Sequence, residues 1–139
     1  KNINKLLINQ NLKIMRVGQN KEVYLYVDED GTMAKGAQRC FKASEFIGAA
    51  GTAETKTMFR FKEIDTWDST DAFDSFELTH TSDAQVEVIK TVLDVMSNPH
   101  GGFVVVHDFS TGETLKFPPI ASTGTAVTLT AAPAVISAS

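Results

Sequence analysis

The sequence contains very little cysteine, and this limits the kinds of site it can build. Cys40 is the only cysteine in 139 residues. A single thiol excludes an internal disulfide framework and any zinc site made from several thiolates. Because an isolated cysteine usually behaves as a small apolar side chain, we expect Cys40 to lie buried in the core rather than to act as a reactive thiol.

Other absences exclude membrane-spanning and phosphate-cradling proteins. No run of 18 apolar residues occurs, so the sequence predicts no membrane span. It shows no secretory signal peptide, although it opens on Lys1 rather than Met, as a trimmed chain would. Neither GxxxxGK[ST] nor GxGxxG follows a predicted strand, so a phosphate-binding loop is not expected.

Charge is scarce in one part of the sequence and unevenly distributed over the rest. Residues 1–62 hold eleven Lys and Arg against six Asp and Glu, whereas residues 63–139 hold two against eleven. The two halves therefore carry +5 and −9, which sum to the net charge of −4, and residues 118–139 carry no charged side chain. Such polarity either guides subunits together head to tail or vanishes when the halves interleave in one sheet.

The acidic whole argues against a nucleic-acid partner. Basic and aromatic residues do interleave in the first half, as they do on nucleic-acid-binding surfaces. These residues are Arg16, Lys21, Arg39, Lys42, Arg60 and Lys62, with Tyr24, Tyr26, Phe41 and Phe59 between them.

One segment, residues 82–97, predicts a helix around which the other elements are arranged. Ser82 and Gln85 match a capping box at its start, and Pro99 with the glycines after it ends it. Apolar residues three and four positions apart predict one buried face, which Val92 widens. That face is formed by Val86, Ile89, Leu93 and Met96.

Alternating apolar and polar residues predict strands over most of the remaining sequence. In residues 56–63 the alternation turns Phe59 and Phe61 toward the core, and the valines of residues 103–109 are typical of a central strand. Residues 40–50 fit either a short helix or a broken strand. The predicted strands are residues 3–17, 22–27, 56–63, 75–80, 103–109, 114–117 and 127–130.

These elements predict an α+β, mainly β fold. We expect an antiparallel sheet or a partly closed barrel, with one long helix at about residues 82–97 packed on it. The length of 139 residues predicts a single β-rich domain, residues 1–139. Within it, the uncharged residues 118–139 are a candidate extended arm, containing Ile120 and a strand closed by Pro133.

Acidic residues suggest two metal sites, and neither is predicted to bind. Residues 28–31 resemble the start of a calcium loop, but the twelfth position counted from Asp28 is Arg39, a cation where a carboxylate is required. These residues fit a solvated hairpin turn better than a calcium-binding loop. An acidic loop places a carboxylate at every third residue, yet lacks the Gly and Asn ligands that usually accompany such sites. Its members are Asp65, Asp68, Asp71 and Asp74.

The three histidines are candidates for metal binding or proton transfer near the end of the helix. They are His80, His100 and His107. None stands in an HxH or HExxH pattern, and Asp108 would point to the face of a strand opposite His107. His100 is explained by the favourable dipole at the C-terminus of the helix. We therefore predict structural roles for all three, and no catalytic, cofactor-binding or metal-binding residue.

The order of several short phrases resembles structural proteins of marine T4-like tailed phages, of the cyanophage type. The phrases are TMFRF (residues 57–61), SFELTHTS (75–82), AQVEVIKTVLDVMSN (84–98) and GFVVVHD (102–108). An acidic loop lies between the first two, a Thr- and Ala-rich ending follows the last, and the resemblance covers about residues 40–130. It implies a virion component, made in a bacterial host, that assembles with copies of itself and with other virion proteins and has no enzyme activity or cofactor.

The sequence thus favours a non-enzymatic, self-associating capsid, neck or tail protein, most simply a ring. Two alternatives remain open at this point. The first is a β domain that binds a small ligand or carbohydrate through Trp67, Tyr24 and Tyr26. The second is a metal-dependent hydrolase that uses the three histidines and the acidic loop, residues 65–74.

Overall fold

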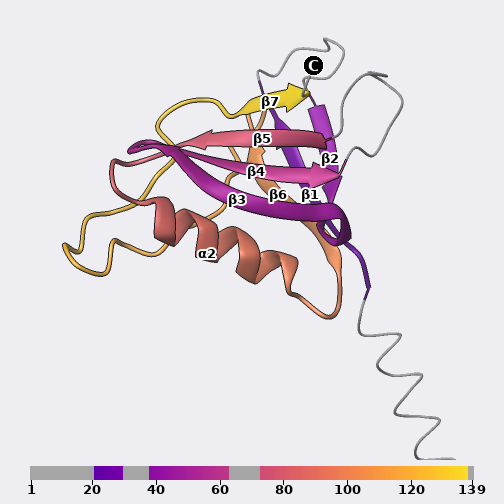
Figure 1. Cartoon of the computed structure of the whole chain (residues 1–139). Coiled ribbons are helices and arrows are strands. Elements are labelled where there is room, and N and C mark those ends of the chain that lie inside the picture. Colours follow the sequence, from indigo (N-terminus) through magenta and orange to yellow (C-terminus); the bar gives the residue numbers. More distant parts are fainter. Residues whose placement is uncertain (1–20, 30–37, 63–72, 138–139) are drawn as a thin grey trace, which may run out of the picture.

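The computed structural model describes residues 21–29, 38–62 and 73–137, which form two sheets and a helix. Sheet A has the strand order β2-β1-β6, and sheet B the order β3-β4-β5-β7. The sheets lie as two layers, and α2 runs along one open side between them (Figure 1). The elements are β1 (Val23–Asp28), β2 (Gln38–Lys42), the 3-10 turn η1 (Ala43–Glu45), β3 (Phe46–Ala53), β4 (Lys56–Lys62), β5 (Phe73–Thr79), α2 (Gln85–Met96), β6 (Gly102–Asp108) and β7 (Ala134–Ser137).

This arrangement confirms a mainly β fold with one helix packed on it, and the sheets are not closed into a barrel. Three predicted features lie outside the described residues: the strand at residues 3–17, the end of the turn at residues 28–31, and most of the acidic loop, residues 65–72. Within the described parts of the chain, no helix is long and apolar enough to cross a membrane.

The core lies between the sheets and is built from alternating strand residues. In β4, Thr57, Phe59 and Phe61 are fully buried, whereas Arg60 and Lys62 between and after them are exposed. The prediction that the two phenylalanines face the core is therefore confirmed, and the residues after Lys62 lie outside the described parts. Successive side chains of a strand point to opposite faces, so one face of β4 packs against sheet A and the other remains outside.

Residues 40–50, which fit two structures in the sequence, form parts of two strands joined by η1. The chain passes here from sheet A to sheet B. Phe41 points into the core and is 1% exposed, so its neighbour Cys40 points outward. Cys40 is exposed, and the expectation that it lies in the core is wrong. Desolvation nevertheless raises the pKa of its thiol above the ordinary value of 9.0, which keeps it protonated at neutral pH.

Sheet A is a mixed sheet rather than an antiparallel one, because it contains a parallel pair of strands. β1 pairs antiparallel with β2 and parallel with β6, with a bulge between Tyr26 and Val27. Among the described strands β1 is therefore the central one and β6 lies at an edge, so within them residues 103–109 do not form the predicted central strand. Within the described residues the second half of β6 gains a further neighbour, since Leu115 N donates to Val106 O at 3.0 Å.

The helix is confirmed, but its start and its buried face differ from the prediction. It begins at Gln85 without a side-chain cap, and the Gln85 amide donates instead to Ala53 O at the end of β3, at 3.0 Å. The fully buried residues are Val88 and Val92. Val86 is 57% exposed, and the direction between Val88 and Val92 lies about 100° around the helix from the middle of the expected stripe, given roughly 100° per residue. Of the predicted face, Leu93 is also exposed, whereas Ile89 and Met96 pack against the core.

The segment after β6 returns to the core as irregular chain. The predicted strand at residues 114–117 is a single bridge between His107 and Thr114, and that at residues 127–130 is a bridge between His80 and Leu129. The strand forms after Pro133 instead, as β7. Ile120 and Val127 are 8% and 6% exposed, so part of the candidate arm contributes to the core.

The corrected helix face gives a stability prediction. Val92→Ala removes two buried methyl groups and should lower the free energy of unfolding by about 1–3 kcal/mol. Val86→Ala, on the same helix and with the same chemistry, should change it by less than about 0.5 kcal/mol. Urea unfolding followed by circular dichroism measures both. Equal losses, or a larger loss for Val86→Ala, would contradict the assignment.

Candidate interaction surface

The outer face of sheet A carries aromatic side chains that are exposed or partly exposed. β1 alternates, so that Val23, Leu25 and Val27 face the core while Tyr24 and Tyr26 face outward. Tyr24 is 40% exposed. Polar residues normally occupy the solvent face of a strand in a two-layer fold, so two tyrosines here are available for contact with another molecule.

The neighbouring strand extends this surface. Phe103 of β6 lies in register with Tyr24, and Val105 with Tyr26. The rings of Tyr26 and Phe103 have centroids 5.5 Å apart, and Phe103 is 63% exposed. We call Tyr24, Tyr26, Phe103 and Val105 the aromatic face. Its residues sit on paired strands, whose ladders hold the rings in fixed positions.

The two ends of the aromatic face carry opposite charges. Lys42 of β2 stands opposite Tyr24 at one end. At the other end Asp28 and Asp108 lie in register on the parallel strands, and we call these two residues the acidic end. Ser110 covers them: its hydroxyl donates to Asp28 Oδ2 at 3.0 Å, and its amide donates to Asp108 Oδ1 at 2.9 Å.

The acidic end affects the nearest aromatic side chain. Desolvation raises the pKa of Tyr26 above its ordinary value of 10.0, and the charges of Asp28 and Asp108 raise it further. The phenol therefore remains neutral at physiological pH and keeps its O–H as a donor. The sequence placed Asp28 and Tyr26 in separate candidate sites, and the pairing of β1 with β6 is what brings them together with Asp108.

The three histidines do not converge. His80 precedes α2 and His100 follows it, so the two lie at opposite ends of a helix about 18 Å long. His80 is fully buried and bonded at both ring nitrogens. Its Nδ1 donates to the Thr81 carbonyl at 2.8 Å, so its Nε2 accepts from the Thr57 hydroxyl at 2.8 Å when the ring is neutral. These bonds connect the end of β5 to β4.

His107 is the one histidine near the acidic end. Desolvation lowers its pKa below the ordinary value of 6.5, while the charges of Asp108 and Asp28 act in the opposite direction. The buried Nδ1 has no hydrogen-bond partner among the described residues. The sequence predicted that the strand turns His107 and Asp108 to opposite faces. Asp108 gives the buried Nδ1 no hydrogen bond, but its negative charge still acts on the pKa of His107.

A cleft of about 410 Å³ lies where β1 begins, between η1 and the end of α2. Glu22 and Ser44 meet there: Ser44 N donates to Glu22 Oε2 at 3.1 Å, and the Ser44 hydroxyl donates to Oε1. Desolvation, which acts upward, is outweighed by these bonds and the charge of Lys42, so the pKa of Glu22 lies below its ordinary value of 4.5. A carboxylate engaged in this way holds the turn in place, and no histidine lines the cleft.

Most of the candidate metal-binding carboxylates of the acidic loop lie outside the described residues. Asp74 is the only member of the acidic series within them, and it forms an ion pair with Arg39 at 3.2 Å that links the two sheets. In the parts of the chain that the structure describes, no three His, Cys, Asp or Glu residues gather as metal ligands would. Trp67 lies outside those parts, and of the predicted ligand-binding residues Tyr24 and Tyr26 are placed together.

Comparison with protein-family models, with curated proteins and with solved structures gives no match to this chain.

The position of His107 predicts how stability depends on pH. Because its pKa is lowered in the folded protein, the unfolded chain binds the proton more tightly, and stability is lost as the pH falls below about 6.5 toward the folded value. Urea unfolding at about pH 7 and about pH 5.5 should show a smaller loss in His107→Gln than in the wild type. The exposed His100 provides the control: His100→Gln should lose as much stability as the wild type. Equal losses in all three proteins would show that His107 does not contribute.

Proposed function

We propose that this chain is a non-enzymatic structural protein that assembles with copies of itself. The observation that carries the proposal is the aromatic face, where Tyr24, Tyr26 and Phe103 lie together on the outside of sheet A. Apolar patches exposed on the surface of soluble proteins commonly mark contact sites, and Tyr and Phe are enriched in such contacts.

Free strand edges support the same proposal. Among the described strands β3 lies at one edge of sheet B, and its eight residues, FIGAAGTA, carry no charge. Edge strands of monomers usually carry charges, prolines or covering segments that prevent pairing with another chain. Gln85 covers the end of β3 through its bond to Ala53 O. The first half of β6, which precedes the bridge at His107, has a described partner strand on its β1 side alone.

A place in the virion of a tailed phage, as a capsid, neck or tail component, is the further part of the proposal. It rests on the phrases within residues 57–108 that resemble such proteins. Virion proteins act by repeated contact between copies and with other virion proteins, so an exposed apolar face on a rigid domain is consistent with that location.

One alternative retains a specific observation. Tyr24 and Tyr26 do lie on one exposed face, as a carbohydrate-binding surface would require. That face is an open sheet rather than a concave site, whereas ligand pockets enclose most of their ligand. Self-association therefore explains the surface better. The hydrolase alternative has no comparable support, because the helix separates His80 from His100.

The proposal predicts the mass of the protein in solution. At tens of micromolar in low salt, light scattering should give a mass well above that of a single 15.1 kDa chain. Phe103→Glu places a charge in the aromatic face and should shift the mass toward one chain.

Val86→Glu is the matched control, because it adds the same charge at an exposed site on α2 and should leave the wild-type mass unchanged. Circular dichroism confirms that each variant is folded. A folded wild type with the mass of one chain under these conditions would contradict the proposal.

A further inference from the structure

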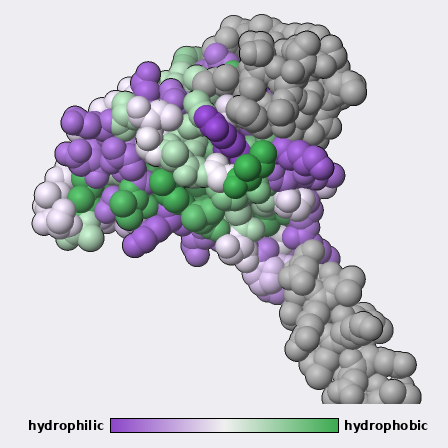
Figure 2. All heavy atoms as spheres, viewed as in Figure 1, coloured by the Kyte–Doolittle hydropathy of each residue, from purple (hydrophilic) through white to green (hydrophobic). Residues whose placement is uncertain are grey.

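The outer face of sheet B contains a hollow between side chains of β3 and β4. Its volume is about 290 Å³. Five lining residues belong to β3 and two to β4, and we call these seven residues the β3 hollow: Ile47, Gly48, Ala49, Ala50, Thr52, Met58 and Arg60. Figure 2 shows the same side of the molecule, with apolar atoms over β3 and α2 and hydrophilic atoms around them.

The hollow arises because small residues stand next to large ones. Gly48 pairs with Arg60, and Ala50 pairs with Met58, so short side chains on β3 leave space beside long ones on β4. A Cβ placed on Gly48 would meet no atom within 4 Å. Pockets for drug-sized ligands span about 300–1,000 Å³, so this hollow lies at the lower end of that range and has room for one aromatic side chain.

We propose that the aromatic face of one copy docks on the β3 hollow of the next copy, with Phe103 entering the hollow. This inference rests on the proposed self-association and names the two surfaces that form the contact. Phe103 is the most exposed of the large apolar side chains on the aromatic face, and a ring that fills a pocket in a partner is a typical anchor of a protein interface.

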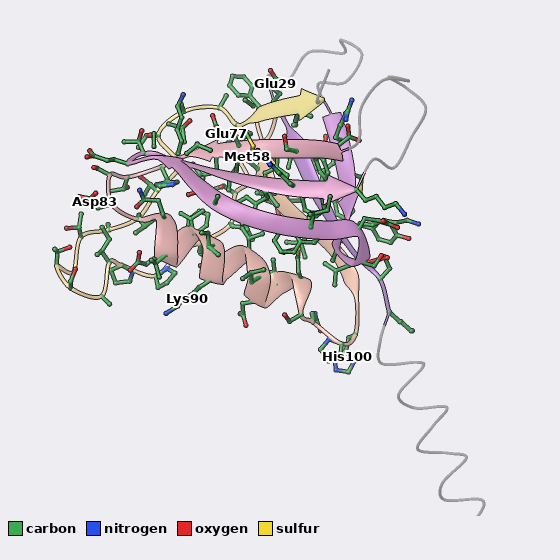
Figure 3. All side chains as sticks on the ribbon, in the orientation of Figure 1. Glu29, Met58, Glu77, Asp83, Lys90 and His100 are labelled. Carbon is green, nitrogen blue, oxygen red and sulfur yellow. The ribbon has the colours of Figure 1, made fainter. Side chains whose placement is uncertain are left out.

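The charges around the two surfaces are complementary. On sheet B, Arg60 and the exposed Lys62 stand at one end of the β3 hollow, and Glu77 stands toward the other, beside Met58 (Figure 3). Lys56 and Thr52 contact Glu77 at 3.9 Å and 2.9 Å, which fixes its carboxylate on this face.

The outer face of sheet A carries a complementary arrangement of charge, acidic at one end and basic at the other. The acidic end lies at one limit of the aromatic face and Lys42 at the other, with apolar side chains between them. Asp28 is 1% exposed and bound by Ser110, so the partly exposed Asp108 is the carboxylate of the acidic end that can meet another copy. One docking orientation therefore places Asp108 against Arg60 and Lys62, and Lys42 near Glu77. Complementary charges of this kind fix the orientation of a contact and speed its formation, more than they add affinity.

The two surfaces lie on opposite layers of the fold, with the core between them (Figure 1). A contact between unlike surfaces is heterologous, so each added copy leaves one aromatic face and one β3 hollow open. Such a contact continues until a ring closes or extends into a filament. An aromatic face docked on its own equivalent would instead stop at a dimer.

A mixing experiment separates these arrangements. Phe103→Glu spoils the aromatic face and Ala50→Glu spoils the β3 hollow, and both add the same charge. Alone, each variant should have the mass of one chain. Mixed in equal amounts, they should form a dimer containing one copy of each, because the intact aromatic face of Ala50→Glu can dock on the intact hollow of Phe103→Glu. Light scattering and native mass spectrometry measure the mass and composition.

Gly48→Glu serves as a second hollow variant, since its side chain enters open space and should not disturb folding. The inference is overturned if the wild type is oligomeric but the mixture stays monomeric, or if the folded hollow variants keep the wild-type mass. Both of those outcomes leave the proposed self-association intact. A monomeric wild type overturns both.

Discussion

The contact of Phe41 with the phenylalanines of sheet B is the interaction on which the rest of the structure depends. Phe41 belongs to sheet A, and its ring centroid lies 4.9 Å from that of Phe61 and 5.2 Å from that of Phe76. Phe59 stacks on Phe76 at 5.1 Å, and all four rings are at most 1% exposed. Burial of each ring contributes roughly 2–3 kcal/mol, and each aromatic pair about 0.5–1.5 kcal/mol beyond burial. The ion pair of Arg39 with Asp74 also connects the two sheets.

Joining the sheets in this way determines which surfaces remain outside. The inner faces are occupied by the phenylalanines and by α2, whose Val88 and Val92 close one open side. The outward residues of β1 and β6 are then left as the aromatic face, and those of β3 and β4 as the β3 hollow. Both surfaces belong to hydrogen-bonded ladders that share one core, so a copy docked on one side is held at a fixed angle to a copy on the other. A constant angle between successive copies is what a ring or filament requires.

The sequence predicted the features that depend on neighbouring residues. The alternation of Phe59 and Phe61, the position of the helix and the dominance of strands follow from local patterns, and the structure has all three.

Features that depend on distant contacts were not predicted. Residues 82–97 contain two overlapping apolar stripes, and the sheet that α2 packs against selects Val88 and Val92 over Val86 and Leu93. The parallel pairing of β1 with β6 joins residues about 80 positions apart and places Phe103 beside Tyr24, so the aromatic face has no local signal in the sequence. Alternation did place Tyr24 and Tyr26 on one face of their strand.

The central claim is that unlike faces of successive copies meet, and the exposed Cys40 allows a direct measurement. Cys40 lies beside Tyr26 on the outer face of sheet A, and Ala50 lies in the β3 hollow. Cys40 lies two strands and two residues from Phe103, roughly 12 Å at about 4.8 Å per strand and 3.3 Å per residue, so a flexible crosslinker rather than a direct disulfide is required. In the Ala50→Cys variant, a bis-maleimide should join the thiol at position 40 of one copy to the thiol at position 50 of the next. A denaturing gel should then show a ladder of covalent multimers, and mass spectrometry should identify the mixed crosslink. The wild type, with Cys40 alone, should show no ladder under the same treatment. Crosslinks only between two Cys40 residues, already present in the wild type and ending at dimers, would contradict the account.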